Sequence, residues 1–98
     1  MAEGKQVECG ERMTIEQVES LYSQLEAAVL DNDYIELIAD RVQQCDTASL
    51  QLIVNLLRLS KQQGNTVKWI KPSAAILNVA KLLGLTESLE LTQHITQQ

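Results

Sequence analysis

A short polar run in the middle of the chain carries the residues best suited to binding another molecule. Residues 45–57 read Cys-Asp-Thr-Ala-Ser-Leu-Gln-Leu-Ile-Val-Asn-Leu-Leu, so a polar start passes directly into an apolar segment. Asp46 and Thr47 are good helix N-caps, because their side-chain oxygens accept backbone N–H groups that lack partners in the first turn. We therefore predict an exposed helix N-terminus, whose N–H groups favour anions, including a phosphorylated hydroxyl.

The helix that begins at this run is predicted to be buried on most sides. Its apolar residues leave little polar face: Leu50, Leu52, Ile53, Val54, Leu56, Leu57 and Leu59. A helix that is apolar all round normally lies in the interior of a domain. The working site, if the protein has one, is therefore expected at the polar end, residues 46–49.

Alternating strand and helix patterns on both sides of the run predict the elements that position it. Before the run we expect a strand at 5–9 with a short return strand at 13, a helix at 15–30 and a strand at 34–39. A capping box at Thr14 and Gln17 begins that helix. The helix after Asp46 is followed by a strand at 67–71, a helix between Ser73 and Gly84, and a last short strand at 89–91. Gly64 and Gly84 are expected in left-handed positions after helices.

This alternation predicts an α/β fold with crossovers that join parallel strands. We expect a four- or five-stranded, mainly parallel sheet with an N-terminal hairpin, and three main helices packed against it. The 98 residues suffice for a single domain, 1–98, with a core of about 5–91. Residues 92–98 are polar and are expected to fray.

Composition excludes several classes of function. The net charge of −5 argues against nucleic-acid binding, which depends on basic contacts to phosphate. No apolar run approaches the roughly 20 residues of a membrane span, and the first residues lack a secretory signal, so we expect a cytoplasmic protein without direct membrane insertion. Cys9, Cys45 and the single His94 lack metal-ligand spacing, so we predict reduced thiols, no metal and no cofactor.

The charge is unevenly distributed along the sequence. Residues 1–46 hold 11 acidic and 3 basic residues, a net charge of −8, whereas residues 47–98 hold 2 acidic and 5 basic residues, a net charge of +3. Opposite signs on different faces can steer a partner, although a solvated surface without such a role accounts for the same pattern.

The polar run also resembles a known motif. Asp46 to Leu50, Asp-Thr-Ala-Ser-Leu, is similar to the Asp-Ser-Ser-Gly-Leu motif of STAS domains, the family of anti-sigma-factor antagonists. Residues 10–15, 62–67 and 82–85 resemble that family's glycine-containing segments before the first helix, before the third core strand and after the third helix. The resemblance spans roughly residues 8 to 91 and implies the STAS fold.

The resemblance implies a regulatory protein-binding module. In STAS antagonists a partner kinase phosphorylates one of the two hydroxyl residues after the Asp, and the phosphorylated form releases its partner. Thr47 occupies the first of these positions and is the possible phosphoacceptor, whereas Ala48 cannot be phosphorylated and Ser49 stands at the usual glycine. The expected partner-binding residues are Asp46, Thr47, Ala48, Ser49 and Gln51. A phosphate there would add about −1.5 to −2 charge units beside Asp46.

Several alternatives stay open. Asp-Thr-Ala also resembles the MlaB-type regulatory subunit of a phospholipid-transport ABC ATPase, where the Thr lies at the contact with the ATPase. Residues 69–73 and 82–85 resemble small STAS proteins of chemotaxis systems. The expected partner is accordingly an anti-sigma kinase-like ATPase, a chemotaxis signalling protein or an ABC ATPase, with the signalling interpretation preferred and the loop at 72–73 as an additional contact.

Three further interpretations concern the residues themselves. Thr47 could simply cap its helix while Asp46 orients the loop. An enzyme is disfavoured, because the sequence has no Gly-rich phosphate loop and no Cys/His pairing. The apolar content of the second and third helices suits a small-ligand pocket, but it suits a packed core equally well, and the single Trp69 is expected in that core.

Overall fold

The computed structural model describes residues 4–95, and its centre is a three-stranded parallel sheet. The strands are β1 (Lys5–Glu8), β3 (Tyr34–Ile38) and β5 (Thr66–Ile70), in the order β1-β3-β5. Alternate side chains point to opposite faces, as the pleat requires. One face is buried and consists of Val7, Ile35, Leu37, Val67 and Trp69. The predicted α/β class and the parallel crossover between 34–39 and 67–71 are therefore confirmed.

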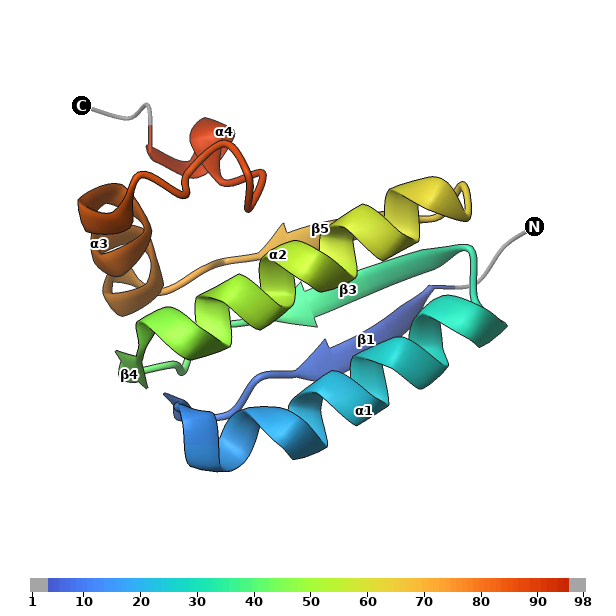
Figure 1. Ribbon diagram of the computed structural model, residues 1–98, viewed down its shortest axis with the longest axis horizontal. Helices are drawn as coiled ribbons and strands as arrows, with labels where there is room; N and C mark the ends of the chain where they lie inside the picture. Colours follow the sequence, from blue (N-terminus) through green and yellow to red (C-terminus); the bar gives the residue numbers. More distant parts are fainter. Residues whose placement is uncertain (1–3, 96–98) are drawn as a thin grey trace.

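Two long helices cover the buried face of the sheet. Helix α1 (Ile15–Asp31) precedes β3, and α2 (Thr47–Gln62) makes the crossover from β3 to β5. Figure 1 shows α1 and α2 side by side across the same face of the sheet. The predicted bounds of both helices agree with the structure, including Gly64 with a positive φ just after α2.

A second, two-stranded sheet lies at the end of the molecule where α1 and α2 begin. Its strands β2 (Arg12–Met13) and β4 (Gln44–Cys45) pair in parallel. The predicted N-terminal hairpin is therefore wrong, because β1 pairs in parallel with β3, and the short strand after it pairs with β4. Gly10, at φ +78°, turns the chain between the two sheets rather than back upon β1.

The last part of the described chain folds without a further strand. Helix α3 (Ala74–Leu83) ends in Gly84 at φ +68°, and the Leu85 N–H bonds the Ala80 carbonyl, which is the predicted Schellman arrangement. The expected strand at 89–91 is wrong: the Leu89 carbonyl accepts a hydrogen bond from Trp69 Nε1 at 2.7 Å instead of joining a ladder. Leu89 and Leu91 are buried in the core.

The polar C-terminal segment is more ordered than expected. Residues Thr92–Ile95 form a short helix, α4, rather than a frayed tail, and the rest of the predicted tail, 96–98, lies outside the described residues. None of the helices in the described part of the chain combines the length and apolar character needed to cross a bilayer.

Candidate partner-binding site at the start of α2

The polar turn before α2 is held by one carboxylate that caps two helices. Asp46 Oδ1 accepts the Ser49 N–H at 3.0 Å, which is the predicted N-cap of α2. Asp46 Oδ2 accepts the Ile15 N–H at 2.9 Å, at the first residue of α1. The predicted capping box at Thr14 is wrong, because no Thr14 side-chain cap forms and the Asp46 carboxylate takes that function from a distant part of the chain.

The environment of Asp46 favours its ionised form. The pKa of this carboxyl lies below its ordinary value, first because of the Ser49 side chain and backbone N–H, and then because of the Ile15 N–H. The Ser49 hydroxyl faces the carboxylate without meeting strict hydrogen-bond geometry, and no other partner for it lies among residues 4–95. A fixed negative charge therefore lies at the turn, directly before Thr47.

The structure divides the predicted site residues between surface and interior. Thr47, Ala48 and Gln51 are exposed, and Thr47 and Gln51, four residues apart, lie on one face of α2. Asp46 is half-buried, whereas Ser49 is 0 % exposed. The expectation that Ser49 belongs to the contact surface is therefore corrected: its side chain packs inside, beneath the turn.

Helix α2 itself is less buried than its composition suggested. Seven of its residues are buried, but a continuous polar stripe remains open to solvent, formed by Thr47, Gln51, Asn55 and Arg58. The stripe follows the helical spacing of i, i+4, i+8 and i+11, so α2 is amphipathic rather than apolar all round. Thr47 lies at one end of this stripe.

Two elements lie next to the turn, and one of them adds a residue that the sequence analysis did not single out. Ile15, held beside the turn by Asp46, is 53 % exposed, although it starts an otherwise well-packed helix. Ser73 caps α3, because its Oγ accepts the Ile76 N–H at 3.3 Å. Cys45 Sγ lies 3.6 Å from the Ala75 carbonyl oxygen, which places the start of α3 beside β4 and the turn. The exposure of Ile15 could have been predicted from the sequence, because Ile15 lies outside the apolar stripe of α1.

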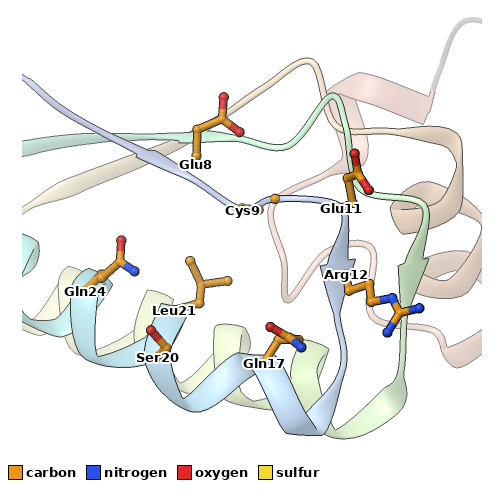
Figure 2. Close-up of a pocket in the computed structure, with 9 residues that line it drawn as sticks. Glu8, Cys9, Glu11, Arg12, Gln17, Ser20, Leu21 and Gln24 are labelled. Atoms are coloured by element: carbon orange, nitrogen blue, oxygen red, sulfur yellow. The ribbon is translucent and has the colours of Figure 1, made fainter.

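A separate hollow of about 430 Å³ lies between β1, β2 and the first half of α1. Figure 2 shows the Leu21 side chain pointing from α1 towards the segment at Cys9, while the Arg12 side chain points away. Burial, and then the charge of Glu8, raise the pKa of the Cys9 thiol to about 12, so the thiol stays protonated. None of the residues that line this hollow belongs to the site predicted at the start of α2.

The two cysteines are free thiols: Cys9 is buried and Cys45 is half-buried. Within residues 4–95, no three His, Cys, Asp or Glu side chains come together in a way that could hold a metal ion. Trp69, predicted in the core, is 4 % exposed.

A parallel sheet covered by two helices, with a capped, exposed turn before the second, defines a small α/β domain of the STAS kind. The family model described as "Mlab, STAS domain" matches residues 2–93, and the chain belongs to the STAS domain family. A search of curated proteins found no match.

Two solved structures share the fold at low sequence identity. The Bacillus cell fate determinant SpoIIAA in its phosphorylated form superposes with a TM-score of 0.68 at 16% identity, covering 89% of this chain and 80% of that chain. The anti-sigma factor antagonist SpoIIAA in its unphosphorylated form superposes with a TM-score of 0.70 at 15% identity, covering 99% of this chain and 94% of that chain. The expected STAS fold is thereby confirmed.

Proposed function

We propose that this chain is a regulatory protein-interaction module of bacterial signalling, of the anti-sigma-factor-antagonist type, which acts in the cytoplasm. It binds a partner kinase, ATPase or signalling protein through the turn and first residues of α2. The observation that supports this most is the exposed Thr47, directly after the Asp46 carboxylate that caps α1 and α2. Thr47, Ala48 and Gln51 form the contact, Asp46 shapes it, and Ser49 is left out because it is buried.

We further propose that phosphorylation of Thr47 switches the interaction off. A phosphate adds about −1.5 to −2 charge units next to an Asp46 carboxylate that is already ionised. A phosphate on Thr47 and the carboxylate of its neighbour Asp46 repel one another. A partner surface that fits the uncharged Thr47 hydroxyl then loses its complementarity to the turn. The shape of SpoIIAA, solved in phosphorylated and unphosphorylated forms, supports the proposal by analogy of fold.

A second candidate function is an MlaB-type regulatory subunit of a phospholipid-transport ABC ATPase. The description of the matching family model and the Asp46-Thr47-Ala48 sequence both favour it. In this case the same turn contacts the ATPase permanently, and Thr47 serves as a contact residue rather than as a phosphoacceptor.

Purified partners separate the two candidates. We would titrate the immobilised protein with an anti-sigma kinase-like ATPase and with the ATPase subunit of a phospholipid-transport ABC system, and add ATP to each mixture. The signalling proposal expects binding of the first, transfer of phosphate to Thr47, and binding weakened about tenfold or more in Thr47→Glu. Thr66→Glu, at an exposed threonine beyond the far end of α2, is the matched control and should bind normally. Equal binding of Thr47→Glu and wild type to every partner would contradict both candidates.

A further inference from the structure

The outer edge of β1 has no strand partner among residues 4–95. Strand β1 is the first in the order β1-β3-β5, and it pairs with β3 alone in that part of the chain. The Cys9 N–H donates to the Ile38 carbonyl at 2.9 Å, and the backbone groups of successive strand residues point to opposite edges. The N–H and carbonyl groups of Gln6 and Glu8 therefore point outward, away from β3. An edge of this kind is a template for one more strand.

A groove runs along this edge, between β1 and α1. The hollow of about 430 Å³ at residues 8–12 forms one end of it. A second hollow, of about 440 Å³, forms the other end, between Lys5 of β1 and Gln24, Ala27 and Asp31 of α1. Gln24 lines both hollows, so they adjoin, and we call the two together the β1 groove. A groove along an exposed strand edge is the kind of site in which an extended peptide binds by adding to the sheet.

A strand added in this groove would present its side chains alternately to two different surroundings. On the helix side, Gln17, Ser20 and Gln24 lie at i, i+3 and i+7 of α1 and form an exposed polar wall. Figure 2 shows the Gln24 side chain extending from α1 towards β1, whereas the Glu8 side chain points away from α1. One set of peptide side chains would therefore meet amide and hydroxyl groups, and the other set would lie beside the Glu8 carboxylate.

The segment that forms the groove is acidic. Residues 5–31 have a net charge of −4, because they hold six acidic residues and two basic ones: Glu8, Glu11, Glu16, Glu19, Glu26 and Asp31 against Lys5 and Arg12. The salt bridge found within residues 4–95 joins Lys61 to Glu90, so none of these six carboxylates has a cation partner in that part of the chain. Of the two cations, Arg12 points away from the groove (Figure 2). Half of the −8 charge of residues 1–46 thus belongs to this segment, which complements a basic partner.

We propose that the β1 groove binds an extended segment of a partner protein, which adds to β1 as a strand and places Lys or Arg beside Glu8. The outward backbone groups of Gln6 and Glu8 supply the hydrogen bonds, and the acidic surroundings select the basic sequence. A second copy of this chain is the less suitable occupant. Figure 1 shows α1 beyond the outer edge of β1, so two sheets joined edge to edge at β1 would bring their α1 helices into the same space. This contact is additional to the turn at Thr47 and does not require Thr47 to be modified.

Short synthetic peptides test the charge preference. One alternates threonine and lysine over about six residues, the length of an ordinary strand, and a second alternates threonine and glutamate. Both are labelled for fluorescence anisotropy against the full chain. The basic peptide should bind about tenfold or more tightly than the acidic one, shift the amide resonances of residues 5–9, and slow hydrogen exchange of the Gln6 and Glu8 N–H groups. Equal binding of both peptides, binding of neither, or shifts confined to β5 would overturn the proposal.

Backbone N-methylation of the basic peptide separates strand addition from attraction between charges. A methyl group removes the N–H of a residue and keeps its side chain. Because only alternate N–H groups of an added strand point to β1, methylating one set of nitrogens should weaken binding about tenfold, and methylating the other set should leave it unchanged. Sensitivity of the lysine nitrogens indicates antiparallel addition, and sensitivity of the threonine nitrogens indicates parallel addition. An equal effect of both sets, or no effect of either, would overturn the proposal.

Matched variants locate the contact. Gln24→Trp fills the groove where its two hollows adjoin, without a change of charge, and should weaken binding of the basic peptide about tenfold. Ser23→Trp, at the exposed neighbour that lines neither hollow, is its control. Glu8→Lys should make the acidic peptide the tighter ligand. Glu26→Lys makes the same change at an exposed position outside both hollows and should alter binding by less than about threefold.

The remaining outcomes are equally distinct. All four variants should keep the circular-dichroism spectrum of the wild type, because each replaces an exposed side chain. Control variants that weaken binding as much as their partners would overturn the proposal. Concentration-dependent dimers in sedimentation velocity that Gln24→Trp abolishes would show that a second copy covers the edge, and would overturn it as well. Thr47→Glu should leave peptide binding intact, so failure of this proposal and failure of the function at the turn are separate results.

Discussion

Asp46 accepts a hydrogen bond from the backbone N–H of Ile15, which lies 31 residues earlier in the chain, at 2.9 Å. The same carboxylate caps α2 through the Ser49 N–H, so one side chain fixes the starts of both helices that cover the sheet. The two helix N-termini are thereby set side by side around the exposed Thr47. The shape of the proposed contact surface depends on this carboxylate.

Replacing Asp46 by Ala should destabilise the fold at neutral pH. The variant loses the N-cap of α2, typically worth about 0.5–2 kcal/mol, and the bond to Ile15, worth about 0.5–1.5 kcal/mol. We expect a loss of about 1–3 kcal/mol in urea unfolding followed by circular dichroism. Asp46→Asn keeps the cap geometry without the charge and should lose less. An Asp46→Ala protein as stable as wild type would contradict the double cap.

The contribution of Asp46 should depend on pH in one direction. Its pKa in the folded protein lies below the ordinary value of 3.8, because hydrogen bonds from Ser49 and Ile15 favour the carboxylate. The stabilisation is therefore fully present above pH 3.8 and is lost as the pH falls through the folded pKa. The difference in unfolding free energy between wild type and Asp46→Asn should shrink over that interval. A difference that grows on acidification would show that the charge opposes folding.

Trp69 should tie the C-terminal segment to the sheet. Its Nε1–H donates to the buried Leu89 carbonyl at 2.7 Å, and Trp69→Phe leaves that carbonyl without its donor. We expect a loss of about 1–3 kcal/mol in unfolding free energy, measured by far-UV circular dichroism. Lys68→Ala, next to it on the exposed face of β5, is the control and should change stability by less than about 0.5 kcal/mol.

The two thiols should differ in their reaction with iodoacetamide. The pKa of Cys9 is raised to about 12 by burial and then by Glu8, and the pKa of the half-buried Cys45 is raised by partial burial and then by Asp46. Because the thiolate is the nucleophile, Cys45 should be alkylated slowly at pH 8 and Cys9 not at all until the protein unfolds. Mass spectrometry of native and urea-unfolded samples checks this order. Cys9 reacting first in the native state would contradict its burial.

The sequence predicted the parts of the fold that depend on local pattern. Helical spacing located α1, α2 and α3, because a stripe such as Val18, Leu21, Leu25 and Val29 has a period of its own. The residues of the exposed turn, Thr47 and Ala48, were found in the same way. The family assignment followed from the order of these local signals rather than from any one of them.

The predictions that the structure contradicts, and the contacts that were not predicted, mostly involve residues far apart in the chain. The pairing of Met13 with Cys45 cannot be predicted from two-residue strands, whose local pattern is too short to specify a partner. The Asp46 bond to Ile15 and the Trp69 bond to the Leu89 carbonyl likewise join distant segments. The burial of Ser49 was missed because a serine in the first turn of a helix normally faces water, whereas here α2 begins against the core.

Thr47 and Ser49 should respond in opposite ways to the same substitution. Thr47 is exposed at the first residue of α2, where the helix dipole stabilises a negative charge by about 0.3–1 kcal/mol and the neighbouring Asp46 opposes it. Thr47→Glu should therefore change stability by less than about 1 kcal/mol. Ser49→Glu buries an unpaired carboxylate and should cost more than about 3 kcal/mol or prevent folding.

Ser49→Ala completes this comparison. The buried Ser49 hydroxyl forms no strict hydrogen bond within the described residues. Removing this hydroxyl should therefore lower the free energy of unfolding by less than about 1 kcal/mol. Thermal unfolding of the three variants would therefore rank Ser49→Ala and Thr47→Glu near wild type and Ser49→Glu far below. Because a kinase needs an accessible hydroxyl, this ranking restricts the proposed switch to Thr47. A well-folded Ser49→Glu protein would mean that both hydroxyls reach the surface, and the proposed contact would then include Ser49.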